Sequence, residues 1–111
     1  MAYDRELADR VRDVLTGEDG LSERAMFGGL AFLVHGHVAV VASGQGGLMV
    51  RVPPEDYDAL LGGPVRPVEM RGREMRGWLR VEPVAGGEEL ERWVRLGLTF
   101  ARSLPAKAGH G

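Results

Sequence analysis

Residues 26–52 constrain the fold of this 111-residue chain more than any other stretch. They contain three apolar runs rich in β-branched or bulky side chains, at residues 30–35, 38–43 and 48–52. Gly36 follows the first run, and residues 44–47, which include three glycines, follow the second. Short apolar runs separated by glycine turns are typical of consecutive antiparallel strands. The stretch therefore predicts a three-strand meander.

Helical spacing precedes this meander. Apolar side chains recur at steps of three and four residues at Tyr3, Leu7, Val11 and Val14. This spacing predicts an amphipathic helix, and Gly17 is placed to end it. Residues 21–26 are ambiguous and are compatible with a short edge strand.

A short helix and a hairpin are expected after the meander. Pro53 and Pro54 end the third strand and suit the first turn of a helix that extends to Leu61. Residues 65–70 and 75–81 then flank a polar turn, which predicts a hairpin. With Gly72 and Arg73 as turn residues, Met70 pairs with Met75 and Glu69 lies opposite Arg76. Strict alternation would place one set on the inner face, Val68, Met70, Met75, Leu79 and Val81, and another on the outer face, Arg76, Trp78 and Arg80.

The last helix is the most strongly patterned. Its apolar stripe consists of Leu90, Trp93, Val94, Gly97, Leu98, Ala101 and Leu104, and Pro105 ends it. Leu96 and Phe100 widen the apolar arc to about 200°, more than packing against one sheet face uses. We therefore expect Trp93, Leu96 and Phe100 to form a face for self-association. We expect an α+β domain over residues 1–104, with about five antiparallel strands and N-terminal, middle and C-terminal helices, followed by a disordered tail at 105–111.

Composition excludes several classes of protein. The chain has no cysteine, so it has neither disulfides nor thiolate chemistry. Its formal net charge of -2 gives no overall attraction to nucleic acid. Its start lacks the basic residues and apolar run of a secretory signal, and its apolar runs are too short to span a bilayer. We expect a cytoplasmic protein with no membrane partner.

No residue pattern predicts catalysis, a cofactor or a metal. The glycines at 44–47 lead into a strand, whereas phosphate-binding glycine loops lead into a helix. His35 and His37 flank a turn glycine without the third ligand that zinc requires. Ser22, Ser43 and Ser103 lie outside any nucleophile pattern. We therefore expect a non-enzymatic protein.

The hairpin region is locally basic. Five arginines but only two glutamates lie between Arg66 and Arg80, and Trp78 stands among them. Such a group suits phosphate contact and base stacking. An alternative function is therefore nucleic-acid binding through Arg71, Arg73, Arg76, Trp78 and Arg80, against the simpler interpretation of a solvated outer sheet face.

Several short sequence elements resemble the N-terminal domain of the TfoX/Sxy family of competence regulators. The opening signature R-x-M-F-G-G is matched by Arg24, Met26, Phe27, Gly28 and Gly29. Arg76-Gly77-Trp78 resembles the hairpin block, and residues 100–104 resemble the end of the last helix. The resemblance extends over residues 3–104.

The resemblance implies an α+β domain with an antiparallel sheet and no established catalytic residue. On physical grounds we expect Gly28 and Gly29 to serve unusual dihedral angles or close backbone approach, and Met26 and Phe27 to anchor the turn in the core. Two-domain members also carry a helical C-terminal domain, so this chain would correspond to a stand-alone N-terminal domain. We expect a non-enzymatic regulatory or protein-binding module that self-associates.

Overall fold

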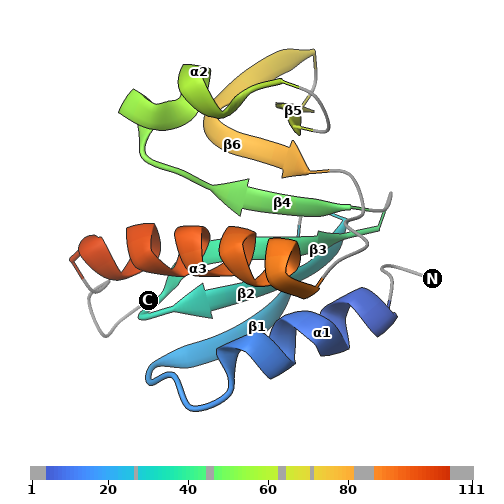
Figure 1. Cartoon of the computed structure of the whole chain (residues 1–111), viewed down its shortest axis with the longest axis vertical. Helices are drawn as coiled ribbons and strands as arrows, with labels where there is room; N and C mark the ends of the chain where they lie inside the picture. The colour runs from blue at the N-terminus through green and yellow to red at the C-terminus, as the bar shows by residue number, and fades with distance from the viewer. Residues whose placement is uncertain are drawn as a thin grey trace.

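In a computed structural model of the chain, six antiparallel strands form one sheet in the order β1-β2-β3-β4-β6-β5 (Figure 1). The structure describes residues 5–26, 28–44, 47–62, 65–70, 72–81 and 87–105. The strands are β1 (Leu21–Met26), β2 (Gly29–Val34), β3 (His37–Ser43), β4 (Leu48–Arg51), β5 (Val65–Met70) and β6 (Arg73–Val81). The helices are α1 (Arg5–Leu15), the 3-10 turn η1 (Pro54–Asp56), α2 (Tyr57–Leu60) and α3 (Gly87–Ser103). The expected α+β class is confirmed.

The predicted meander is present as β2, β3 and β4, each antiparallel to the next. The ambiguous segment before it is a full strand, because all six residues of β1 pair with β2. This strand raises the expected number from five to six. Of the predicted first helix, Tyr3 lies outside the described residues.

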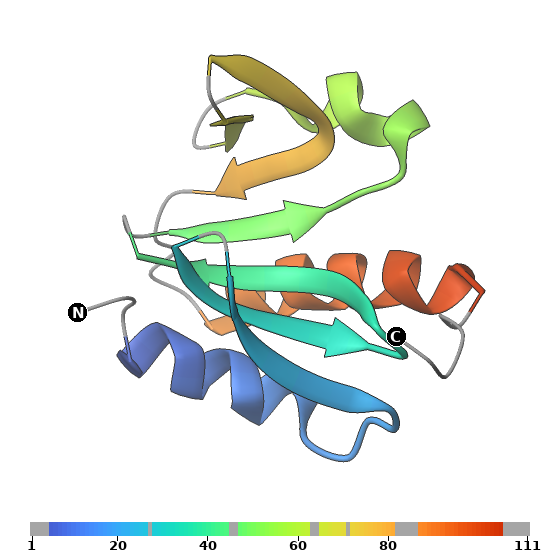
Figure 2. The same cartoon turned by 180° about the vertical axis from the view of Figure 1, so that it is seen from behind.

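Both long helices lie on one face of the sheet. In Figure 1, α1 and α3 lie in front of the strands. Figure 2 shows the molecule from behind, and there the strands lie in front of the helices. The main core fills the space between them, with side chains from the helices and from alternate strand positions. Its helix contribution includes Val11, Leu90, Val94 and Leu98. This arrangement explains the amphipathic spacing of both helices.

A second apolar cluster lies on the opposite face. It consists of Ala31, Leu33, Val41, Met49 and Val68, all nearly inaccessible to solvent. Partly buried residues pack against it: Met26, Val38, Met75 and Trp78. These positions alternate with those of the main core along β2 and β4, and along β3 except at a bulge, where Ala39 and Val40 both belong to the main core. The two-sided burial explains why the runs read as continuous apolar stretches instead of alternating ones.

The predicted hairpin register is wrong: the turn comes one residue earlier than expected, so the partners of Met70 and Glu69 differ by two residues from those predicted. Met70 pairs with Arg73, and Glu69 lies opposite Glu74 instead of Arg76. The strand resumes at Arg73 because Gly72, with φ of +78°, occupies the last turn position before it. The favourable charge pair expected across the hairpin therefore does not form.

The predicted division of hairpin side chains between the faces is also wrong. Leu79 and Val81 are in the main core, whereas Met75 and Trp78 pack against the second cluster. The change of face falls at Gly77, which has φ of +92° and so departs from extended strand geometry. Its carbonyl accepts a hydrogen bond from the Val52 N–H at 2.8 Å. The alternation of side chains between the two faces is therefore interrupted at this glycine, and Leu79 and Val81 lie on the opposite face from Met75 instead of sharing one with it.

The C-terminal end of α3 is tied to two loops. Arg102 donates to the Glu18 carboxylate at 2.9 Å and to the Asp19 carbonyl at 3.0 Å. The Nε2 of His37 lies 2.6 Å from the carbonyl oxygen of Pro105. Of the predicted tail at 105–111, residues 106–111 lie outside the described part.

Candidate interaction surfaces

The outer flank of α3 is defined by Trp93, Leu96 and Phe100. All three side chains are half-buried. Trp93 and Leu96 pack against the edge of the main core, and the guanidinium carbon of Arg51 lies 5.5 Å from the centre of the Phe100 ring. The wide apolar arc is thus partly covered within one copy of the chain. The remaining exposed area is an apolar strip along one side of the helix.

The five residues proposed for nucleic-acid contact do not share one surface. Arg71 lies outside the described residues, and Arg73 is exposed beside the turn. Arg76 lies against α2: its guanidinium donates to Asp58 at 3.2 Å and stands 4.8 Å from the centre of the Tyr57 ring. Trp78 packs against the second cluster, on the other side of the hairpin.

Tyr57 links the middle helix to β6. Its side chain is fully buried in the main core, and its hydroxyl donates to Glu74 at 3.2 Å. Burial raises the pKa of this phenol, and the bond to the Glu74 carboxylate raises it further. Tyr57, Glu74 and Arg76 therefore serve to hold α2 on the hairpin.

Arg80 belongs to a different group on the other face. Its guanidinium donates to the Ser43 hydroxyl at 3.1 Å, and Arg66 lies directly opposite it on β5. Arg66 and Arg80 line a hollow of about 460 Å³ together with Pro67 and Glu69. Two arginines at opposed strand positions give this hollow a local positive charge.

The residues of the R-x-M-F-G-G element have separate roles. Gly28 has φ of +72°, and a β-carbon on Gly29 would lie 2.1 Å from the Ala42 carbonyl oxygen. The backbone at Gly28 is left-handed, and the backbone of β3 approaches Gly29 closely. Met26 packs beside the second cluster, and Phe27 lies outside the described residues. Arg24 is exposed on β1, where the fold gives it no packing role.

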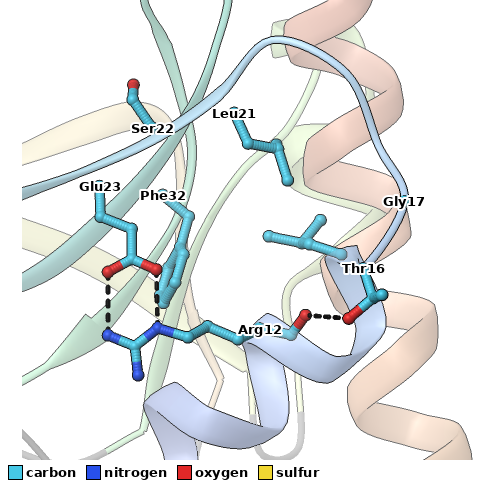
Figure 3. A pocket seen from close by; sticks show the side chains of 8 residues that line it. Arg12, Thr16, Gly17, Leu21, Ser22, Glu23 and Phe32 are labelled. Carbon is cyan, nitrogen blue, oxygen red and sulfur yellow. Dashed lines mark hydrogen bonds and ion pairs between the residues drawn. The ribbon is translucent and has the colours of Figure 1, made fainter.

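A smaller pocket of about 220 Å³ lies between the end of α1 and the start of β1 (Figure 3). Its apolar lining comes from Leu15, Leu21 and Phe32. Arg12 borders it and binds the Glu23 carboxylate through two nitrogens, at 2.7 and 2.9 Å. This bidentate bond lowers the pKa of Glu23.

No sequence pattern pointed to this pocket, because Arg12 and Glu23 are paired only by the fold. The one available signal was Leu21, an apolar residue that begins the edge strand and is followed by three polar residues. At 37% exposure, it is the one large apolar side chain that stands exposed among the described residues.

The two turn histidines serve local structure. His35 has φ of +50° and its N–H donates to the Gly20 carbonyl at 2.9 Å, while His37 lies against Pro105. Within the described ranges, no three histidine or acidic side chains are grouped so that they could hold a metal ion. No helix of those ranges is long and apolar enough to cross a membrane.

Comparison with known proteins gave one family. The family model described as the TfoX N-terminal domain matches residues 13–101. The matched range begins within α1 and ends within α3, so it includes the whole sheet. No curated protein and no solved structure matches the chain.

Proposed function

The chain belongs to the TfoX N-terminal domain family, and from this we propose that it is a non-enzymatic regulatory module that binds protein and self-associates. The family is not a known enzyme family. The observation that carries the proposal of self-association is the outer flank of α3, where Trp93, Leu96 and Phe100 remain half-exposed.

The argument rests on the width of this apolar strip. The inward side of α3 is already buried in the main core, through Leu90, Val94, Leu98 and Ala101. The outer flank adds three large side chains at spacings of three and four residues, so they line up along the helix. A second copy packed on this flank would bury them symmetrically. A few residues near the centre of an interface contribute most of its binding energy, and tryptophan is enriched among them.

Leu96→Glu is expected to convert a dimer into a monomer, because it places a charge at the centre of the proposed interface. Light scattering coupled to gel filtration at tens of micromolar measures the mass. Thr99→Glu is the matched control, since Thr99 is an exposed residue of the same helix. It introduces the same charge away from the flank and should leave the mass unchanged.

A monomeric wild-type chain at this concentration would refute self-association. Because Leu96 also contacts the edge of the main core, Leu96→Glu must be checked by thermal unfolding. Phe100→Glu provides a second test at a position that packs against Arg51 instead. A monomeric variant that keeps the wild-type circular dichroism spectrum supports the proposal.

Nucleic-acid binding is a second candidate, favoured by the hollow beside Arg66 and Arg80. Arg66 and Arg80 occupy directly opposed positions on neighbouring strands. Trp78 lies on the same face of the sheet as Arg80, which is paired with Met49 of the second cluster. Phosphate oxygens would find two cations there, and a base would find an aromatic ring. Arg76 has no part in this surface, because it is bound to Asp58 against α2.

Salt dependence tests this candidate with a built-in control. Binding of a fluorescent single strand should weaken as salt rises, and Arg80→Ala should reduce the slope of the logarithm of affinity against the logarithm of salt by about 0.7. Arg76→Ala should leave that slope unchanged. No binding at low salt, or equal effects of the two substitutions, would exclude this surface.

A further inference from the structure

The outer edge of β1 is an open edge of the sheet. β1 is the first strand in the sheet order, and among the residues that the structure describes it pairs with β2 alone. All six of its pairs with β2 are in register, without a bulge or a proline. Alternate backbone N–H and C=O groups of such a strand point outward and can accept a further strand.

The opposite edge of the sheet is protected. β5 contains Pro67, which has no N–H to donate, and its register with β6 shifts between Pro67 and Glu69. Proline and bulges are the usual features that prevent an edge strand from pairing further. The contrast singles out β1 as the edge suited to strand addition.

The pocket in Figure 3 lies beside this open edge. Leu21 and Glu23 of β1 line it together with Leu15 and Phe32, and the exposed Leu21 stands at its border. Leu21 and Glu23 are opposed to Val34 and Phe32 of the main core, so they point to the helix side of the sheet. A strand added to β1 would therefore direct alternate side chains toward this pocket.

Arg24 marks the other side of the same strand. It lies opposite Ala31 of the second cluster and so points to the face without the long helices. It is exposed, and within the described part of the chain its guanidinium has no partner. An acidic side chain directly across from it on an added strand would pair with it.

A second copy of β1 fits this edge poorly. Two copies of β1 could pair antiparallel about a two-fold axis perpendicular to the sheet, which keeps each side chain on its own face. Directly opposed residues share a face, and faces alternate along a strand, so an even-numbered residue must lie opposite an even-numbered one and an odd-numbered residue opposite an odd-numbered one. The two registers that pair five residues of β1 then place Glu23 opposite Glu23 or Arg24 opposite Arg24 of the second copy. Like charges directly opposed are destabilising. Charge complementarity thus favours a segment of a different protein over a second copy of β1 as the added strand.

We propose that β1 accepts an extended segment of a partner protein as a seventh strand, with an apolar side chain in the pocket beside Leu21 and an acidic side chain opposite Arg24. The two side chains lie three positions apart on the partner, since Leu21 and Arg24 are three apart and on opposite faces. The main-chain hydrogen bonds supply affinity, and the pocket and the ion pair supply specificity.

Titration of the isotope-labelled full chain with synthetic peptides tests this proposal by amide chemical shifts. The peptides carry phenylalanine and aspartate three positions apart among threonines and valines, in both orders, because the added strand can run in either direction. We expect shifts confined to β1, the end of α1 and Phe32. Replacing the peptide phenylalanine by asparagine should weaken binding at least about tenfold.

A charge exchange makes the test specific. Replacing the peptide aspartate by lysine should weaken binding to the wild type about fivefold, and the preference should reverse with Arg24→Glu. Arg92→Glu, a charge reversal at an exposed position of α3, should leave the preference unchanged. Arg24→Gln, which should bind both peptides equally, serves if the reversed charge impairs folding.

Three results would overturn the proposal. The first is the absence of shifts in β1 at millimolar peptide, and the second is a peptide preference that Arg24→Glu does not reverse. The third is a change of oligomeric state with Arg24→Glu, which would assign the edge to a second copy. Each is distinct from a failure of the α3 interface, which Leu96→Glu reports.

Discussion

Replacing Gly29 by alanine is expected to destabilise the protein by about 3 kcal/mol, near the upper end of the range for overpacked cores. The added β-carbon would lie 2.1 Å from the Ala42 carbonyl oxygen and 3.0 Å from the Ser43 α-carbon. Both are main-chain atoms of β3, so no side-chain rotation relieves the clash and β2 must separate from β3. Thermal unfolding should show a Tm roughly 15 °C below that of the wild type.

Gly28→Asn is the matched control for this substitution. Gly28 has φ of +72°, but a β-carbon there would meet no atom within 4 Å. Asparagine tolerates this left-handed conformation, so the cost should stay below about 1 kcal/mol. If Gly29→Ala proved as harmless as Gly28→Asn, β2 and β3 would not approach each other closely at Gly29.

Gly97→Ala is expected to destabilise the protein by about 2 kcal/mol, although alanine ordinarily stabilises a helix interior by about 1 kcal/mol relative to glycine. A β-carbon at this position would lie 2.5 Å from the Ala39 carbonyl oxygen and 2.9 Å from the Val40 Cγ1. The helix must then move away from β3, which loosens the contacts of the whole main core. Urea unfolding measures the change in the free energy of unfolding.

Gly87→Ala provides the comparison within the same helix. Gly87 begins α3, and a β-carbon there would meet nothing within 4 Å. The free energy of unfolding should change by no more than about 0.5 kcal/mol. If Gly97→Ala proved as harmless as Gly87→Ala, α3 would not pack on β3 at the distance described here.

The sequence was sufficient to predict the parts of the fold that depend on local pattern. The meander follows from apolar runs between glycine turns, and α1 and α3 follow from their helical spacing. β1 is ambiguous from sequence because an exposed edge strand carries no apolar alternation: its first five residues are exposed and Met26 is half-buried. Such a strand is defined by its neighbour in the sheet and not by its own composition.

The hairpin shows where local pattern fails. The predicted faces of the hairpin follow from strict alternation of side chains, which takes Gly77 as an ordinary strand residue. Its positive φ exchanges the two faces, so Arg76 turns toward Tyr57 while Trp78 and Arg80 turn to the second cluster. A glycine within a strand is a sign of such an irregularity, but the sequence does not say in which direction the chain turns.

The candidate surfaces also differ in whether local sequence pattern predicts them. The flank of α3 was accessible from sequence because Trp93, Leu96 and Phe100 belong to one helix of regular geometry. The pocket beside β1 was not, because its lining joins residues of α1, β1 and β2 through tertiary contacts. The ion pair between Arg12 and Glu23 cannot be predicted from the number of residues between them, because the two residues lie on different elements.

The place of α3 across the sheet also bears on how the protein is made. The strands of the meander pair with near neighbours and can form as soon as they leave the ribosome. Their apolar helix-facing side, however, is covered by α3, which contacts β2, β3 and β4 and follows all six strands in the chain. A nascent chain without residues 87–103 would therefore display an uncovered apolar sheet, the kind of surface that chaperones bind. Burial of the sheet is thus linked to the synthesis of α3.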